Sequence, residues 1–174
     1  MKLKKIILVC LGMFLITGCD NMMNDSPTMA VESFFRKYQN ADETILRQLD
    51  LMLDTKTEYS DDDKKDYKAL MIKQYQNLSY KITEERQKGD TAVIETEVEV
   101  FDYKNSINKS NDYYSSHKDE FKDKSLISYQ LSKMKDVEEK VIYQITFNLT
   151  RDKDGKWKID EMNDDEKQKI HGLY

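Results

Sequence analysis

The stretch Thr91-Ala-Val-Ile-Glu-Thr-Glu-Val-Glu-Val100 decides the fold of this chain. From Ala92 to Val100, every second residue is apolar or threonine, and three glutamates stand between the last of them. Successive side chains of a β-strand point to opposite faces of the sheet, so the alternation predicts a strand with one buried and one solvated face. The glutamates would lie about 7 Å apart along the strand. We interpret them as surface residues, because a catalytic pair of carboxylates needs a shared cleft and two different environments.

Two predicted hairpins extend outward from this strand. Upstream, residues 78–82 alternate between apolar and polar, and residues 88–90 (Lys-Gly-Asp) supply a turn. Downstream, residues 141–149 repeat the period of two, and Asp154-Gly155 gives the turn that brings the pattern back to Trp157. Such segments, bounded by glycine-containing turns, are typical of antiparallel hairpins. We expect Trp157 to face the core together with Phe147 and with Phe34 or Phe35.

Helical patterns precede the sheet. Residues 26–27 (Ser-Pro) have the order of an N-cap and a first helical residue, and an apolar stripe follows over residues 31–38. Asp42 is the expected cap of a second helix, and Ser60 that of a third. The acidic triplet 61–63 then falls in a first helical turn, where the helix dipole favours anions. We prefer this interpretation of the triplet to a metal site.

An insert of about residues 104–136 separates the two hairpins. Its first part, residues 104–123, is polar and rich in asparagine, and we expect it to be irregular. Ser125 is the expected cap of a short helix. The insert could be a mobile lid or a simple crossover, and both interpretations stay open. Residues 163–174 form a polar tail with one or two expected turns of helix.

The N-terminus has the pattern of an export signal. Three lysines precede an apolar run over residues 6–16. This run is too short for a bilayer, which needs roughly 20 apolar residues, but it suits the central region of a secretory signal. The next residues, Ile16-Thr17-Gly18-Cys19, resemble the lipobox of bacterial lipoproteins. That resemblance implies cleavage before Cys19 and attachment of a diacylglycerol to the Cys19 sulfur.

The lipobox resemblance also implies an organisation and a location. Residues 1–18 would be the signal peptide, 19–26 the acylated cysteine and a tether, and 27–174 a single α+β domain. The membrane is then a partner through the lipid on Cys19, because two chains anchor stably where one does not. Asp20 and the Lys-, Asp-, Asn- and Ile-rich composition both favour the outer face of the cytoplasmic membrane. Since the second cysteine, Cys10, would be removed, no thiol would remain for catalysis or disulfides.

Composition and motifs exclude several classes of function. The formal net charge is −5, which argues against a nucleic-acid partner held through phosphates. We find no zinc, phosphate-loop or hydrolase motif, so we expect no cofactor, no metal and no catalytic residue. Residues 150–161 have part of a calcium-loop spacing, but the flanking alternation favours a hairpin there. The two histidines, His117 and His171, lie in polar stretches and are expected at the surface.

Residues 27–35 (PTMAVESFF) and 155–159 (GKWKI) resemble the opening and closing motifs of the nuclear transport factor 2 and ketosteroid isomerase superfamily, in particular small Firmicutes lipoproteins of that fold. The resemblance implies a cone in which helices pack on a curved antiparallel sheet and enclose a cavity. Its enzyme members place an aspartate base in that cavity. Here the inward positions are apolar apart from two tyrosines, with Asp102 at the rim.

Because the inward positions are apolar, we expect a binding protein without catalytic activity. We expect a small apolar ligand, a peptide or an envelope protein as the partner, and the candidate cavity lining is Tyr80, Val98, Tyr143 and Phe147. Tyr80 and Tyr143 would orient the ligand, because a few polar groups in an apolar pocket set orientation. The alternative is a cavity-based hydrolase or isomerase of the ketosteroid isomerase type.

Overall fold

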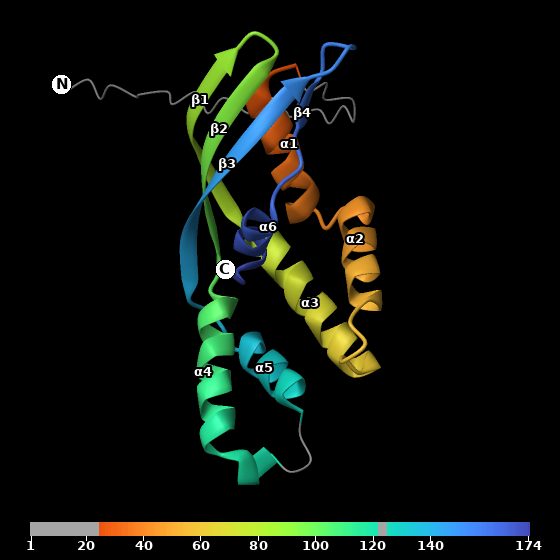
Figure 1. The fold of residues 1–174 in the computed structure, drawn as a ribbon, viewed down its shortest axis with the longest axis vertical. Coiled ribbons are helices and arrows are strands. Elements are labelled where there is room, and N and C mark those ends of the chain that lie inside the picture. Colours follow the sequence, from red (N-terminus) through yellow and green to blue (C-terminus); the bar gives the residue numbers. More distant parts are fainter. Residues whose placement is uncertain (1–24, 122–124) are drawn as a thin grey trace, which may run out of the picture.

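The computed structural model describes residues 25–121 and 125–174, and it shows helices packed on an antiparallel sheet (Figure 1). The elements in chain order are α1 (Pro27–Gln39), α2 (Glu43–Asp54), α3 (Asp61–Asn77), β1 (Ser79–Lys88), β2 (Thr91–Phe101), α4 (Tyr103–Ser116), the 3-10 helix η1 (Lys118–Phe121), α5 (Leu126–Lys135), β3 (Lys140–Arg151), β4 (Trp157–Ile159) and α6 (Asp164–His171). The predicted α+β class is confirmed. The predicted signal peptide, Cys19 and most of the tether lie outside the described residues.

The sheet is a four-stranded antiparallel meander in the order β1-β2-β3-β4. It bends along its length and stays open (Figure 1). The period of two in β2 is confirmed, because its inward residues are buried while its glutamates remain partly exposed on the other face. Both hairpins are confirmed as well, with Lys88 paired to Thr91 and Arg151 paired to Trp157. The segment that carries part of a calcium-loop spacing therefore forms the turn into β4.

Side-chain caps begin each N-terminal helix as the sequence predicts. The Ser26 hydroxyl accepts a hydrogen bond from the Met29 N–H, and Asp42 accepts one from Thr44. Ser60 and Asp63 form a reciprocal capping box at the start of α3. This geometry explains the acidic triplet as a helix start, since it satisfies N–H groups that have no partner within the helix.

The first hydrophobic core lies between α1 and the inner face of the sheet. Phe35 and Phe147 are almost completely buried, and their ring centroids lie 5.5 Å apart in an edge-to-face arrangement. Phe34 lies 5.4 Å from the same ring. Trp157 is buried in this cluster, which confirms its predicted place. Truncating a buried aromatic side chain of this kind typically costs about 3–5 kcal/mol.

A second core joins α2, α3, α4 and α5 at the other end of the molecule, where α4 and α5 extend beyond the sheet (Figure 1). Tyr103 of α4 and Met134 of α5 are buried in it. The expectation of an irregular segment over residues 104–123 is therefore wrong for residues 104–116. The helix begins at Asp102, whose carboxylate caps the Asn105 N–H, and it is stabilised by packing rather than by its asparagine- and serine-rich sequence.

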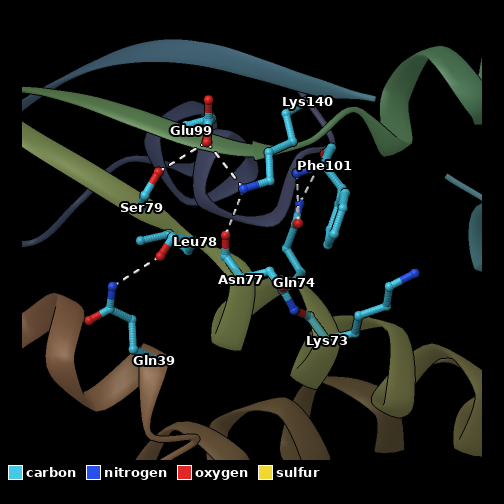
Figure 2. Close-up of polar contacts among 9 residues, drawn as sticks. All are labelled: Gln39, Lys73, Gln74, Asn77, Leu78, Ser79, Glu99, Phe101 and Lys140. Carbon is cyan, nitrogen blue, oxygen red and sulfur yellow. Dashed lines mark hydrogen bonds and ion pairs between the residues drawn. The ribbon is translucent and has the colours of Figure 1, made fainter. Parts of the chain in front are cut away.

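Hydrogen bonds of Gln74 fasten α3 to Phe101 at the end of β2 (Figure 2). A further hydrogen bond joins Gln74 to the C-terminal segment, at the carbonyl of His171. The neighbouring carbonyls at the end of α3 also have partners. Lys140 donates to the carbonyl of Asn77, and Gln39 donates to that of Leu78. The predicted turns of helix near the C-terminus are confirmed by α6, which ends at Gly172 in a left-handed conformation (φ 69°). The hydrogen bonds of Gln74 hold α6 beside α3, and α6 forms one wall of the groove described next.

Candidate ligand-binding groove

The structure places the four predicted lining residues on the inner face of the sheet. Tyr80, Val98 and Tyr143 are cross-strand neighbours in one row, and Phe147 lies four residues along β3 from Tyr143. Val98 and Phe147 are fully packed in the core. The concave face is therefore filled with side chains, and the four do not line the grooves and cavity described here.

Two contacts show what fills the face. The Tyr80 ring stacks on Phe35 of α1 with centroids 4.3 Å apart. The Tyr143 hydroxyl donates a hydrogen bond to the backbone carbonyl of Tyr174, at 2.9 Å. A cavity between these strands and the helices would require α1 and the C-terminal residues to move away. The orienting roles of the two tyrosines stay a prediction, and the grooves and cavity described here lie elsewhere.

An apolar groove of about 430 Å³ lies instead between α1, α2, the end of β4 and α6. Aromatic and aliphatic side chains form most of its wall, and polar groups come mainly from the β4–α6 side. Its lining consists of Phe34, Tyr38, Ile45, Gln48, Leu49, Met52, Tyr75, Ile159, Asp160, Met162, Lys167 and His171. A concave, mainly apolar site with few polar groups is the usual form of a small-molecule site.

Helix α2 forms the outer wall of the groove. Ile45, Leu49 and Met52 follow one another at four- and three-residue spacing, so they share one face of the helix. Ile45 and Leu49 are buried, whereas Leu51 on another face is 61% exposed. The link from α1 turns sharply at Ala41, which takes a positive φ of 47°. This turn directs α2 away from α1 (Figure 1) and leaves room for the groove.

A hydrogen-bonded pair, Tyr75 and His171, contributes polar atoms to the groove. The Tyr75 hydroxyl lies 3.1 Å from the Nε2 atom of His171. Burial lowers the pKa of His171 to about 4, so its ring is neutral at pH 7. Burial also raises the pKa of Tyr75 and brings that of Tyr38 to about 12. All three groups lining the groove are therefore uncharged near neutral pH.

The position of His171 corrects the sequence prediction, which placed both histidines at the surface. His117 is exposed and stacks on Tyr113, as expected. His171 is the last residue of α6, and the hydrogen bond from Gln74 to its carbonyl holds this helix against α3. The polar tail gave no sign of this contact, because the partner of His171 lies 96 residues earlier in the chain.

The mouth of the groove carries charges of both signs. Asp160 and Lys167 are exposed there, and the Lys167 ammonium lies 3.6 Å from the carboxylate of Asp164. Asp160 accepts a hydrogen bond from Thr150 at 3.3 Å. An exposed pair of this kind contributes little to stability, since water screens it. The mouth thus offers hydrogen-bonding groups without an excess of positive charge.

The ionisable groups in and near the groove have the following environments. A histidine whose pKa is near 4 is a weak general base at neutral pH, and its ring is already bonded to Tyr75. The glutamates of β2 lie on the opposite face of the sheet, where Glu95 binds Arg86 and Glu99 binds Lys140. Within the described ranges, no three histidine, cysteine or acidic residues are placed to hold a metal ion.

A larger groove of about 530 Å³ lies between α4 and α5. Its lining is mostly polar and charged and includes Lys109, Asp136 and Glu138, with the rings of Tyr113 and Tyr129. Water can solvate more of this surface than of the apolar groove, where a larger share of the exposed surface is hydrocarbon. The apolar groove is for this reason the stronger candidate. The insert contributes no residue to it, so the structure gives the insert no role as a lid over this groove.

The sequence contained one usable sign of the groove. The stripe of Ile45, Leu49 and Met52 shows an apolar helix face, but a stripe alone does not tell whether protein or a ligand covers it. The other wall comes from residues 159–171, more than a hundred positions away. Their approach depends on tertiary contacts that no local pattern records.

Comparisons with known proteins add a distant likeness. No protein-family profile matches the chain, and no curated protein matches it. Among solved structures, the chain is similar to a candidate lipoprotein (ycdA) from Bacillus subtilis, with 15% sequence identity and a TM-score of 0.41. The match covers 83% of this chain and 46% of the other, so this chain spans less than half of that protein's length. In the part of the chain that the structure describes, no helix has the length and apolar character needed to cross a membrane.

Proposed function

We propose that the protein is a lipid-anchored binding protein of the cell envelope, and that the groove between α1, α2 and α6 takes up a small, mainly apolar molecule. The observation that carries this proposal is the groove itself, with about 430 Å³ of space bounded largely by hydrocarbon. Covering apolar surface contributes roughly 25 cal/mol per Å². A ligand that fills the groove would gain from this term along most of its length.

The lipid anchor belongs to the same proposal. The signal pattern and the lipobox resemblance at residues 16–19 support a protein fixed by Cys19 to the outer face of the cytoplasmic membrane. The order of helices and antiparallel hairpins supports the resemblance to the nuclear transport factor 2 superfamily. That fold serves both enzymes and binding proteins, so the groove and its chemistry have to decide between them.

The hydrolase or isomerase alternative has less support. An acid–base reaction needs two groups whose environments separate their pKa values around neutral pH. In the groove, the buried pair has one pKa near 4 and one raised far above neutrality, and Asp160 is exposed at the mouth. We therefore propose a binding role without catalysis.

A melting experiment on the full chain in isolated membranes tests the proposal with a neutral apolar probe, N-phenyl-1-naphthylamine. A ligand that binds only the folded state raises the temperature at which the chain becomes protease-sensitive. We expect stabilisation that grows by about 1.4 kcal/mol for each tenfold excess of probe over its Kd. No shift at saturating probe would contradict a binding role for the groove.

Two tryptophan variants on α2 provide the matched comparison. Gln48→Trp places an indole at the groove, whereas Leu51→Trp places one on the exposed side of the same helix. We expect Gln48→Trp to raise the Kd of the probe about tenfold, because the indole occupies space that the ligand would fill. Leu51→Trp should respond as the unmodified chain does. Equal responses of the two variants would place the probe elsewhere.

A further inference from the structure

A second apolar cavity continues the groove along α2. It has a volume of about 190 Å³ and lies between the end of α2, α3, α4, α5 and the C-terminal residues. Its lining includes Met52, Leu53, Tyr67, Leu131 and Met134. Met52 lines both the groove and this cavity, so its side chain lies between the two spaces.

The two spaces follow each other along the axis of α2. The groove is lined by α2 residues from Ile45 to Met52, and the cavity by Met52, Leu53 and then Lys56. A helix rises 1.5 Å per residue, so the stretch of α2 from Ile45 to Leu53 is about 12 Å long. The two spaces together are therefore elongated along α2. An elongated space suits a linear chain better than a compact fused-ring molecule.

The side chain at the junction suits a gate. Methionine is unbranched and has three rotatable bonds, so it adapts its shape at little cost. Met52 is half-buried, which leaves its end room to move. A thin alkyl chain could pass beside it, whereas a side chain of larger, rigid shape at the same place would close the passage.

Polar groups gather at one end of this path. His171, Asp160 and Lys167 lie at the β4–α6 side of the groove. Lys167 already faces Asp164, and Asp160 adds a further negative charge, so an anionic head group would meet more repulsion than attraction. Gln48 and the neutral His171 ring can exchange hydrogen bonds with an uncharged head.

From this arrangement we infer that the ligand is a linear alkyl chain with an uncharged polar head, and that it runs along α2 past Met52 with its tail in the second cavity. This inference rests on the proposed function of the groove and adds the class of ligand. Met52 is then the residue that sets the accepted chain length. Each further methylene that enters the cavity contributes about 0.8 kcal/mol, until the cavity is full.

Photolabelling of the full chain in isolated membranes tests this path. The probes are octanol, dodecanol and hexadecanol that carry a diazirine at the end of the chain, and peptide mapping locates the attached carbon. We expect octanol to label the groove, at residues 34–38, 43–52, 75 or 159–171. We expect dodecanol to label the second cavity, at residues 53–67, 126–135 or 173–174. Dodecanol label that stays in the groove would overturn the inference while leaving the proposed function intact; absence of groove label with every probe would overturn both.

Variants at the junction separate a gate from a structural role. Met52→Trp should return the dodecanol label to the groove, at the residues that octanol labels in the unmodified chain. Met52→Leu, which nearly conserves volume, should keep the label in the cavity. A dodecanol pattern that is the same in both variants would overturn the role of Met52. Competition with unlabelled dodecanol and dodecanoate at pH 7 tests the head, and stronger competition by dodecanoate would overturn the uncharged assignment.

Discussion

The side-chain amide of Gln74 pairs with the backbone of Phe101 through two hydrogen bonds, as a neighbouring strand would (Figure 2). The amide nitrogen donates to the Phe101 carbonyl at 3.0 Å, and the amide oxygen accepts from the Phe101 N–H at 2.9 Å. The same nitrogen donates to the carbonyl of His171 at 3.0 Å. One fully buried side chain thus joins α3, the end of β2 and α6. Gly172 lies so close that a Cβ there would meet Phe101 and Gln74.

Replacing Gln74 by leucine should destabilise the protein strongly. The variant leaves one N–H and two carbonyls without their partner, and an unsatisfied buried group costs about 1–3 kcal/mol. We expect the free energy of unfolding to fall by about 3 kcal/mol or more. Urea unfolding, with protease sensitivity as the readout, measures this loss. Gln39→Leu is the matched control, since Gln39 gives a single hydrogen bond, to Leu78. Similar losses in the two variants would refute the special role of Gln74.

Asp63 makes stability depend on pH. Its carboxylate accepts hydrogen bonds from Ser60 at the start of α3 and from Ser128 of α5, the latter at 2.7 Å. Burial opposes ionisation, but these hydrogen bonds outweigh it and lower the pKa of Asp63. A carboxylate with a lowered pKa stabilises the fold fully above its unfolded pKa of about 4, and this contribution is lost as the pH falls through the folded pKa.

Asp63→Asn should therefore cost about 1 kcal/mol at pH 7 and progressively less below about pH 4. Asp62→Asn is the control, because the Asp62 side chain in the same turn is 91% exposed. Unfolding curves at a series of pH values measure the difference. A cost for Asp63→Asn that does not change with pH would show that the ionised carboxylate is not what links the two helices.

Thr96 offers a stabilising substitution. Its hydroxyl is fully buried on the inner face of β2 and has no hydrogen-bond partner within the described part of the chain. A buried hydroxyl without a partner carries an uncompensated desolvation cost. Thr96→Val should raise the free energy of unfolding by about 1 kcal/mol. Thr146→Val, which removes a 2.7 Å hydrogen bond to Glu95, should not raise it; a gain in both variants would point to strand propensity instead.

The anchor gives a prediction that does not depend on the groove. Cys19→Ala should leave the precursor uncut and without lipid, because the cysteine sulfur is the expected acyl acceptor. Mass spectrometry of the membrane fraction measures both the N-terminus and the attached mass. A chain from the unmodified sequence with a mature N-terminus other than Cys19 would contradict the lipobox interpretation.

Local patterns predicted the parts of the fold that local interactions determine. The caps at Ser26, Asp42 and Ser60 and the turn at Gly89 satisfy backbone groups only a few residues away, so the sequence shows them directly. Helix α4 was missed for the opposite reason. Its asparagines and serines are poor helix formers, and its burial on α5 is visible only in three dimensions.

The sequence predicted the apolar character of the candidate site but not its position in the fold. The sequence indicated an apolar inner face with Tyr80 and Tyr143 in it, and the structure puts them there. It could not show that Phe35 covers Tyr80, or that α6 returns to set His171 beside Tyr75. Those contacts occupy part of the expected cavity, and the groove lies between α1, α2, the end of β4 and α6.

The most direct test of the groove is the place where benzophenone, a small neutral and apolar photoreactive molecule, attaches to the full chain in isolated membranes. Peptide mapping after illumination gives the labelled residues. We predict saturable labelling confined to the residues that line the groove on α1, α2, α3 and residues 159–171, with Met52 and Met162 among the labelled positions. Labelling spread evenly over exposed segments, or concentrated between α4 and α5, would contradict a binding role for this groove.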